Sequence, residues 1–460
     1  MSKKIVLFLT LAMLLSAQVK LDLNTAVNLA FSHSPAYLQS MKSLEATKAN
    51  ARKTASVFLP KVNLQGQDIL KEKVFTIEMP PFFPGDKPKK VKLDFTRTYQ
   101  FGLNITQPIF TSGQLINTYS ISQLQAKAAE MDFMQKKLDL EYQVKQAFYS
   151  VLLSKKLLEI QKESSRIAFE HYKHVKAMYE VGSVNKFELL QAKVNWENTK
   201  PELLKAENNL KLAKLSLKNV IGLEEDFSVE GELKYIPLEI GIKELEQYML
   251  SHSPSILAMK YRKEAALKGV RLAKAQFGPT VALTFNYNFR SDNFNFKAGN
   301  WEDYYTLALA ISMPLFSGFS RVEDVRAAVS QYHSAKYGEK ALIQGLLLRL
   351  RSAYRKAKEA QASYFAAKET LKEAREGVRL AEVNYRESLI TSLQVEQARL
   401  SLKMAEMNLY NALYQYNLSL AEIESITGYK IGGENEGEKV YCNYITFRRL
   451  NFILLRTRWR

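Results

Sequence analysis

The chain has 460 residues, of which 47% are apolar and 24% are charged, and these values exclude a disordered or collagen-like protein. The formal net charge is +18, but away from the two chain ends the basic residues are spread thinly, which excludes a nucleic-acid-binding stripe. The single cysteine, Cys442, excludes an internal disulfide and argues against a cysteine-based metal site.

The first 17 residues have the pattern of a secretory signal peptide. Lys3 and Lys4 precede an uncharged run over 5–15, and Ser16-Ala17 supplies the small residues of a cleavage site. The run is too short to span a bilayer as a helix, and no later segment reaches the ~18 apolar residues that a membrane helix needs. The sequence therefore predicts an exported chain without a helical membrane span.

The remainder of the chain is predicted to consist of two copies of one structural repeat. His33-Ser34-Pro35 recurs as His252-Ser253-Pro254 at an offset of 219, and Pro108-Ile109-Phe110 recurs as Pro314-Leu315-Phe316 at an offset of 206. The change in offset places a 13-residue insertion in a connecting loop, which the proline-rich run 80–86 fits. The expected divisions are a signal peptide (1–17), a first repeat (18–222), an equatorial connection (223–242), a second repeat (243–428) and a C-terminal tail (429–460).

Both repeats are predicted to contain the same elements in the same order. A helical stretch (24–59 and 243–277) leads to a β-hairpin (61–107 and 280–313), then to a long helix (113–181 and 318–387) and a last helix (185–222 and 391–427). At ~1.5 Å per residue, the long helix equals the two shorter ones placed end to end, so we expect one long rod packed beside two short rods. Apolar residues repeat every 3.5 positions from Leu350 to Tyr385, which is typical of a coiled-coil seam.

The β segments alternate apolar and polar residues, as in Val281, Leu283, Phe285, Tyr287 and Phe289. Two structures have this pattern: a soluble sheet with one face exposed to water, and a membrane barrel wall with lipid on one side and a lumen on the other. The aromatic residues Trp301, Tyr304 and Tyr305 resemble an interfacial girdle and favour the barrel. Four strands are too few to close, and open edges are not viable in lipid, so a barrel requires several chains.

These features together resemble the TolC family of outer-membrane factors. The resemblance rests on the opening 23–30, the two helix–Pro–strand junctions, the strand exits Pro-Ile-Phe-Thr-Ser-Gly and Pro-Leu-Phe-Ser-Gly, and the run 179–183, and it covers about 21–428. It implies an α+β membrane protein that forms a homotrimer, with a twelve-stranded outer-membrane barrel and a periplasmic barrel of helices. It also implies a passive conduit for drugs, metal ions or proteins, working with an inner-membrane pump and a periplasmic adaptor.

The resemblance also implies where the functional residues lie. The helical turns far from the strands would dock the adaptor through Val181, Gly182, Ser183, Ser388 and Leu389. Family members carry acidic residues at the aperture, whereas the matching positions here are Glu188, Gln191, Gln394 and Gln397, so we expect a largely neutral entrance. The lipid-facing barrel wall would include Phe95, Tyr99, Phe101, Leu283, Phe285, Tyr287, Phe289, Leu307 and Leu309.

Other sites have less support in the sequence. Asn185 with Glu188, and Thr391 with Gln394, read as helix caps, and Gly182 as a left-handed helix stop. His171 and His174 could share a metal, but no carboxylate or thiol signature accompanies them. No nucleophile–base pair, phosphate loop or zinc spacing is present, so we expect no enzyme activity, no cofactor and no metal. The alternative function is a soluble periplasmic coiled-coil adaptor with a small β domain.

Overall fold

The computed structural model describes residues 19–432, except 71–74, 82, 86, 94–97, 292–293, 296, 298 and 388. The expected signal peptide, most of the expected tail, Phe95 and Ser388 therefore lie outside the described residues. The chain forms two compact units, and each is described by itself. Unit 1 draws on Met1–Leu44, Glu130–Ala258 and Lys340–Arg460, and unit 2 comprises Glu45–Ala129 and Met259–Glu339.

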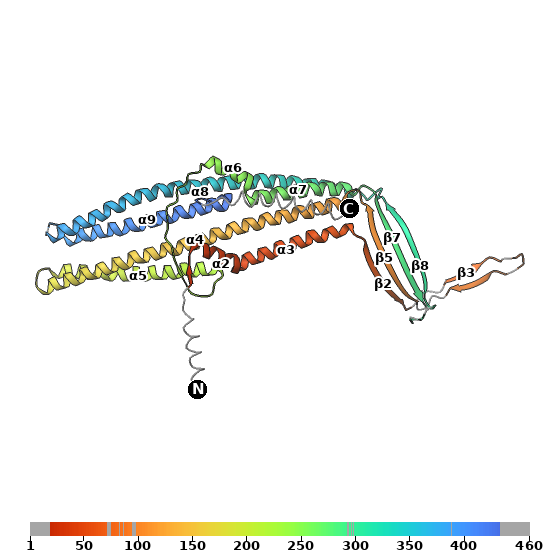
Figure 1. Ribbon diagram of the computed structural model, residues 1–460, viewed down its shortest axis with the longest axis horizontal. Coiled ribbons are helices and arrows are strands. Elements are labelled where there is room, and N and C mark those ends of the chain that lie inside the picture. Colours follow the sequence, from red (N-terminus) through yellow and green to blue (C-terminus); the bar gives the residue numbers. More distant parts are fainter. Residues whose placement is uncertain are drawn as a thin grey trace, which may run out of the picture. The chain divides into compact units, whose positions relative to one another are not determined.

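Unit 2 contains an antiparallel sheet of four strands that lie side by side in the order β2-β5-β7-β8 (Figure 1). The strands are β2 (Lys61–Ile69), β5 (Thr98–Phe110), β7 (Thr280–Ser291) and β8 (Glu302–Ser312). The central pair joins β5 to β7, so the sheet combines strands from both halves of the sequence. Pro108, which lacks a backbone N–H, lies at the register shift near the end of β5.

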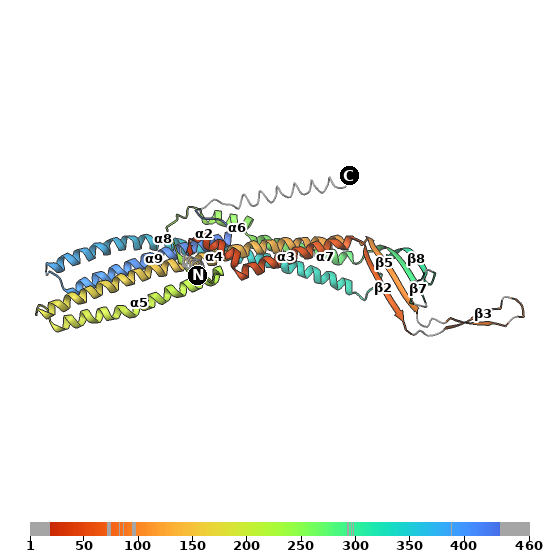
Figure 2. The ribbon, with the colours of Figure 1, turned by 60° about the horizontal axis from the view of Figure 1, so that its bottom comes forward.

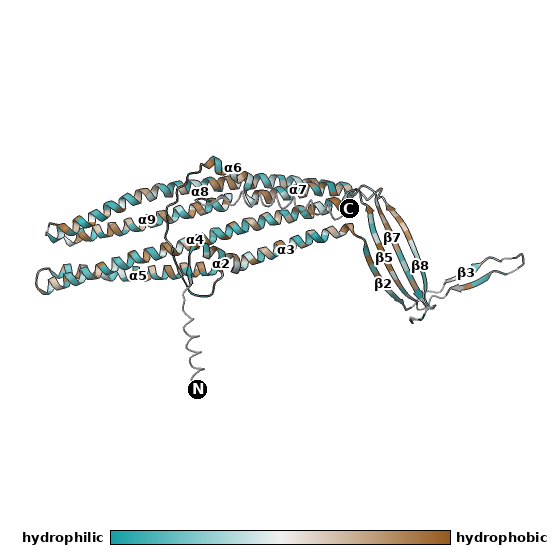
Figure 3. Cartoon of the chain, viewed as in Figure 1, coloured by the Kyte–Doolittle hydropathy of each residue, from teal (hydrophilic) through white to brown (hydrophobic). Residues whose placement is uncertain are grey.

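The register decides which side chains share a face, because directly paired residues point to the same side of a sheet. Phe101 lies opposite Phe289, and Phe285 lies opposite Ile105 on one side and Leu307 on the other. One face therefore carries the described residues of the expected wall: Tyr99, Phe101, Leu283, Phe285, Tyr287, Phe289, Leu307 and Leu309. Hydrophobic and hydrophilic residues accordingly alternate along the strands (Figure 3).

The expected aromatic girdle is divided between the two faces. Tyr305 pairs with Tyr287 on the apolar face, whereas Tyr304 pairs with Asn288 on the polar face, because neighbouring residues of a strand point in opposite directions. Trp301 lies against Phe101, with 5.4 Å between ring centroids. Only Trp301 and Tyr305 of the three therefore belong to the apolar side.

The first hairpin, expected over 61–107, is interrupted by a second one. Strands β3 (Phe75–Met79) and β4 (Lys89–Leu93) pair with each other between β2 and β5, and the described residues of the proline-rich run lie in the turn between them. The alternation that begins at Leu93 therefore belongs to two different strands, since β4 ends there and β5 begins at Thr98. The period-2 pattern predicted extended backbone correctly but did not show where the pairing partner changes.

A close backbone approach joins the strands to the helices of unit 2. The hydroxyl of Ser112 donates to the carbonyl of Pro279 at 2.7 Å, at the point where β5 leads into a helix and another helix leads into β7. A Cβ on Gly278 would lie 2.1 Å from the Ser112 hydroxyl oxygen. Only glycine fits at this junction.

The helices are α2 (Leu23–His33), α3 (Pro35–Ala55), α4 (Gln114–Glu180), α5 (Lys186–Ile221), α6 (Ile242–His252), α7 (Pro254–Ala275), α8 (Ser320–Arg386) and α9 (Ser392–Thr427). Each stretch expected as one opening helix is thus two helices. The break falls at Ser34-Pro35 and Ser253-Pro254, because proline restricts the residue before it to extended backbone. Along the described residues, no helix combines the length and apolar character of a membrane span.

In unit 1, α4 runs beside α5, and α8 runs beside α9 (Figure 2). One core packs α2, α4 and α5 against the short strands β1 (Val19–Leu21) and β6 (Phe227–Val229), with Val144, Leu217 and Ile221 fully buried. A second core packs α6 and α7 against α8 and α9. Each fully buried aliphatic side chain contributes roughly 1.5–3 kcal/mol by leaving water.

The segment 230–241 connects β6 to α6 and anchors on the second core. Its Tyr235 ring stacks on Tyr364 of α8 and Tyr416 of α9, with 5.2 and 5.1 Å between centroids. The Tyr416 hydroxyl donates to the carbonyl of Ile236 at 2.6 Å. The connecting segment therefore packs against both α8 and α9, along the coiled-coil contact that the heptad pattern predicts.

A buried ion network lies where α9 ends. Lys145 of α4 contacts Glu424 of α9 and lies 3.0 Å from Glu141, which in turn contacts Lys430. Burial opposes the charge on Lys145, but the carboxylates of Glu424 and Glu141 outweigh it and raise the pKa of Lys145. Burial likewise opposes the charge on Glu141, but Lys145 and Lys430 lower the pKa of Glu141. Lys145 and Glu141 are therefore held in their charged forms.

Replacing Lys145 with methionine is expected to destabilise the protein by about 3–5 kcal/mol, because the buried carboxylate of Glu424 loses its counter-charge and Glu141 is left with Lys430 alone. Thermal unfolding of the detergent-extracted protein measures the change. The matched control is Arg166→Met, which removes an exposed pair with Glu163 and should have little effect. Equal losses in both variants would contradict the prediction.

The same network predicts a pH window. The raised pKa of Lys145 means that its contribution is present below its ordinary value of 10.5 and is lost as the pH rises through the folded-state pKa. The lowered pKa of Glu141 means that its contribution is present above 4.5 and is lost as the pH falls through the folded-state pKa. The stability difference between wild type and Lys145→Met should therefore be greatest between these limits.

Candidate functional site

Two tight turns end the helix pairs of unit 1: 181–185 between α4 and α5, and 387–391 between α8 and α9. Gly182 has a φ of 76°, which confirms the expected left-handed helix stop. Val181 and Leu389 are 77% and 73% exposed. Each of the two expected docking turns thus presents a large apolar side chain to solvent, which is uncommon at a loop tip.

The four residues expected at the aperture lie in the first two turns of α5 and α9, and all are exposed. The backbone N–H of Glu188 donates to Asn185 Oδ1 at 3.0 Å, and the backbone N–H of Thr391 donates to Gln394 Oε1 at 2.9 Å. Both expected caps are therefore confirmed, the second as a full capping box. Gln191 and Gln397 lie one turn further along each helix.

Sequence reasoning missed the apolar rows beside these turns. Large exposed side chains follow the turns on α5 and α9: Phe187, Leu190, Val194, Leu393, Leu400 and Met404. Their spacing of three, four or seven residues was the available signal, because it places them on one stripe of each helix. The heptad pattern covers only the buried stripe. Exposed apolar rows of this kind mark contact surfaces.

A polar link joins the two helix pairs near the turns. His171 Nε2 of α4 lies 2.9 Å from the Ser392 hydroxyl of α9. Burial lowers the pKa of His171; Glu396 opposes this, whereas Arg399 and His174 add to it. The His171 ring is therefore kept neutral and bonded to a hydroxyl. Among the described residues, no group of three or more His, Cys, Asp or Glu is arranged to hold a metal ion.

Arg399 supports this link from α9. It lies 3.0 Å from Glu382 of α8 and 3.3 Å from Glu396 of its own helix. Its Nε is buried without a hydrogen-bond partner among the described groups. The guanidinium lies among the groups that act on His171, so a second positive charge on the imidazole would be unfavourable there.

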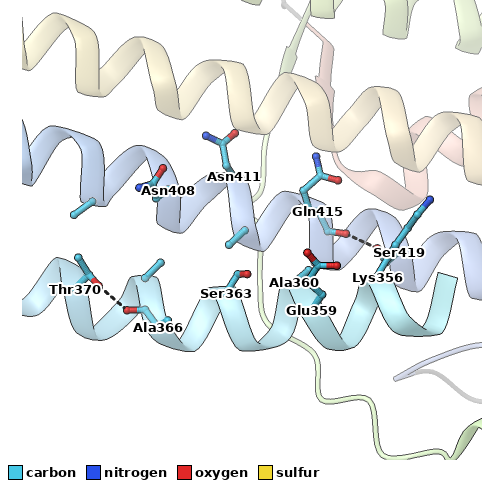
Figure 4. A pocket seen from close by; sticks show the side chains of 13 residues that line it. Lys356, Glu359, Ala360, Ser363, Ala366, Thr370, Asn408, Asn411, Gln415 and Ser419 are labelled. Atoms are coloured by element: carbon cyan, nitrogen blue, oxygen red, sulfur yellow. Dashed lines mark hydrogen bonds between the residues drawn. The ribbon is translucent and has the colours of Figure 1, made fainter. Parts of the chain in front are cut away.

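An open groove of about 620 Å³ runs between α8 and α9 (Figure 4). Small side chains such as Ala360, Ser363 and Ala366 line it from α8, and amides such as Asn408, Asn411 and Gln415 line it from α9. No histidine or cysteine lies among the lining residues, and the charged ones are Lys356 and Glu359 of α8. The groove has the character of a helix-packing surface rather than a catalytic pocket.

The sheet of unit 2 presents its polar side as rows of amides and hydroxyls. Asn63, Asn104 and Asn286 are consecutive partners across β2, β5 and β7, and the Asn104 amide donates to Asn286 Oδ1. Thr106 donates to Asn104 Oδ1 at 3.1 Å. The two edge strands, β2 and β8, are exposed along nearly their whole length. Each edge leaves backbone groups available for a further strand.

Lowering the pH should loosen the link between the helix pairs. Because the pKa of His171 lies below its ordinary value of 6.5, its contribution is present above that pH and is lost as the pH falls through the folded-state pKa. Hydrogen exchange of peptides around 171 and 392, corrected for intrinsic rates, should therefore be faster at acidic pH. His171→Gln should abolish the difference, and His333→Gln, on α8 in unit 2, should not. A response that persists in His171→Gln would assign it to other groups.

Comparison with known proteins gives the family. The model of the family described as "Outer membrane efflux protein" matches residues 26–223 and 245–429. The chain is 24% identical over 354 residues to the probable outer membrane lipoprotein SilC of Salmonella typhimurium, covering 72% of this chain and 74% of that protein. It is 21% identical over 337 residues to the outer membrane protein TolC of Vibrio cholerae, covering 71% and 76%.

The fold agrees with a solved channel. The crystal structure of the CmeC outer membrane channel of Campylobacter jejuni superposes with a TM-score of 0.74, at 18% sequence identity, over 91% of this chain and 88% of that one. The alternative of a soluble periplasmic adaptor is not favoured by these matches, and the resemblance to TolC-family channels is confirmed. The chain belongs to the outer membrane efflux protein family.

Proposed function

We propose that this protein is the outer-membrane channel of a tripartite efflux pump or a type I secretion system. The observation that carries the proposal is the sheet of unit 2, whose four strands place large apolar side chains on one face and amides on the other. Leu307 and Leu309 are 63% and 61% exposed on the apolar face. A transmembrane barrel needs this arrangement, with lipid outside and an aqueous lumen inside.

The exposed edges favour a closed assembly of three chains. In lipid, every backbone N–H and C=O must be paired, so β2 and β8 would each need a neighbouring strand. Pairing β2 of one chain with β8 of the next would close the wall. Three chains supply twelve strands, which leaves a lumen, whereas two chains supply eight, which side chains fill. This argument and the family match both support a homotrimer with a twelve-stranded barrel.

The helices would continue the channel into the periplasm as a barrel of helices. The two helices α4 and α8 have 67 residues each and α5 and α9 have 36 each, which supports an origin by duplication with repeats at 18–222 and 243–428. The exposed apolar turns would dock a periplasmic adaptor, and the pump bound to it would supply the energy. No chemical step on the cargo is required of the channel.

The aperture would be largely neutral. Of the four residues expected there, only Glu188 carries a charge, and Gln394 already accepts a hydrogen bond from its own helix cap. Neutral amides attract cations weakly compared with a ring of carboxylates. The entrance would therefore discriminate little between ions of opposite charge.

Isolation from the native host should recover the protein in the outer membrane as a heat-modifiable trimer. In a Cys442→Ser background, the pair Gln65→Cys on β2 and Thr306→Cys on β8 should cross-link chains into trimers, because both residues lie on the polar face of edge strands. The pair Thr106→Cys and Thr284→Cys, directly opposed on the central strands, should cross-link only within one chain. A soluble periplasmic monomer would overturn the proposal.

Adding carboxylates at the aperture should create cation selectivity. Gln394→Glu with Gln397→Glu keeps a glutamate in the capping box and adds six charges to the proposed trimer, so the permeability of K⁺ over Cl⁻ should rise several-fold. Reversal potentials in planar bilayers measure the change. Gln331→Glu adds charge on α8 away from the turns and should change selectivity much less.

The complementary variant removes the side chains at the same positions. Gln394→Ala with Gln397→Ala should increase single-channel conductance, because it widens the narrowest ring. Unchanged conductance in this variant would rule out the aperture role of these residues.

A further inference from the structure

The hairpin formed by β3 and β4 has no counterpart among the described residues of the second half of the chain, so the duplicated architecture does not account for it. Its register places Ile77 opposite Val91 and Met79 opposite Lys89, so these residues share one face. Thr76 and the pair Glu78–Lys90 lie on the other face, where the Glu78 carboxylate and the Lys90 ammonium are 2.8 Å apart. The hairpin is therefore amphipathic in its own right.

Its apolar face is exposed. Ile77 and Met79 are 51% and 45% exposed, and Phe83 in the turn is 72% exposed. A two-stranded hairpin is marginally stable in water by itself, so an uncovered apolar face of this kind requires a partner. The prolines at 80, 81, 84 and 88 stiffen the turn that carries Phe83.

The charge of the hairpin indicates what that partner is. Between residues 75 and 93 the sequence has four lysines against two acidic residues, Glu78 and Asp86. Lys90 is paired with Glu78, whereas Lys87 and Lys89 make no ion pair with any described residue. Basic residues beside exposed apolar and aromatic side chains are the composition of segments that lie in an anionic membrane interface.

The topology places the hairpin at the end of the sheet that would lie at a membrane surface. It leaves β2 after Ile69 and returns before Thr98, which are paired at the end of the sheet away from the helices. The same end carries an aromatic cluster, in which Phe294 lies 5.1 Å from Tyr99 and Trp301 lies 5.4 Å from Phe101, between ring centroids. Aromatic residues of this kind gather where a membrane meets water.

We propose that the β3–β4 hairpin binds the phosphate-bearing outer surface of the membrane that holds the channel. Ile77, Met79 and Phe83 enter the headgroup boundary, and Lys87 and Lys89 bind lipid phosphates beside them. This inference rests on the proposed function, because it requires the apolar face of the sheet to be in lipid. It adds to the channel a lipid-selective attachment outside the barrel.

Site-directed fluorescence on the full-length protein tests the proposal. An environment-sensitive label is attached to Ile77→Cys in a Cys442→Ser background, and the protein is reconstituted into phosphatidylcholine vesicles with and without lipid A. Quenching by a nitroxide on the lipid should be several-fold stronger at position 77 with lipid A than without it. The label at Thr76→Cys, on the opposite face, should remain unquenched.

Charge variants separate phosphate binding from apolar contact. Replacing Lys87, Lys89 and Lys90 with glutamine should abolish the effect of lipid A at position 77. The matched triple variant replaces Lys205, Lys211 and Lys214 of α5 with glutamine and should leave it unchanged. Quenching that is independent of lipid A and of the hairpin lysines would overturn the proposal.

A label at Leu309→Cys, on the apolar face of β8, distinguishes a failure of the hairpin proposal from a failure of the channel proposal. Quenching at 309 without quenching at 77 would overturn the hairpin proposal and leave the channel intact. An absence of quenching at both positions would overturn both. Shielding of position 77 in detergent, with cross-links between the Ile77→Cys residues of two chains, would assign the apolar face to a second copy and also overturn the proposal.

Discussion

The pairing of β5 with β7 is the interaction on which the function of this protein depends. It joins the two halves of the sequence and sets Phe101 opposite Phe289 and Ile105 opposite Phe285. A slip of one residue would turn the apolar side chains of one pair of strands toward the polar face of the other. Because the register is held, four strands present one apolar face and one face of amides, and a wall between lipid and water becomes possible.

A different constraint applies to the helical unit, because long helices need specific side-chain contacts with their neighbours at intervals along their length. Tyr235 of the equatorial connection stacks between α8 and α9, and the charged network of Lys145, Glu141, Glu424 and Lys430 joins α4 to the end of α9. Near the turns, a bond between His171 and Ser392 joins the helix pairs. The buried contacts hold the middle of the unit, whereas the link near the turns is weaker and titratable.

Much of this could be predicted from the sequence because it depends on local periodicity. The stepping of apolar residues predicted the seam from Leu350 to Tyr385, all of whose members are buried or half-buried, and the capping signals at Asn185 and Thr391 located the start of α5 and α9. The same method missed the break at Ser34 and Ser253, because a proline in a first helical turn also suits a continuous segment. It merged β4 with β5, because alternation shows that the backbone is extended and does not identify the partner strand.

The sequence by itself determined the class of each element, the order of the elements along the chain and the likeness to a family of channels, since these properties depend on residues close together along the chain. Only the tertiary structure decided that Tyr304 and Tyr305 face opposite ways in a paired sheet, that His171 bonds to a hydroxyl more than 200 residues away, and that the insertion is an amphipathic basic hairpin. These features depend on register and on contacts between distant segments. Such contacts are chosen by the packing of the whole fold and leave no periodic trace in the sequence.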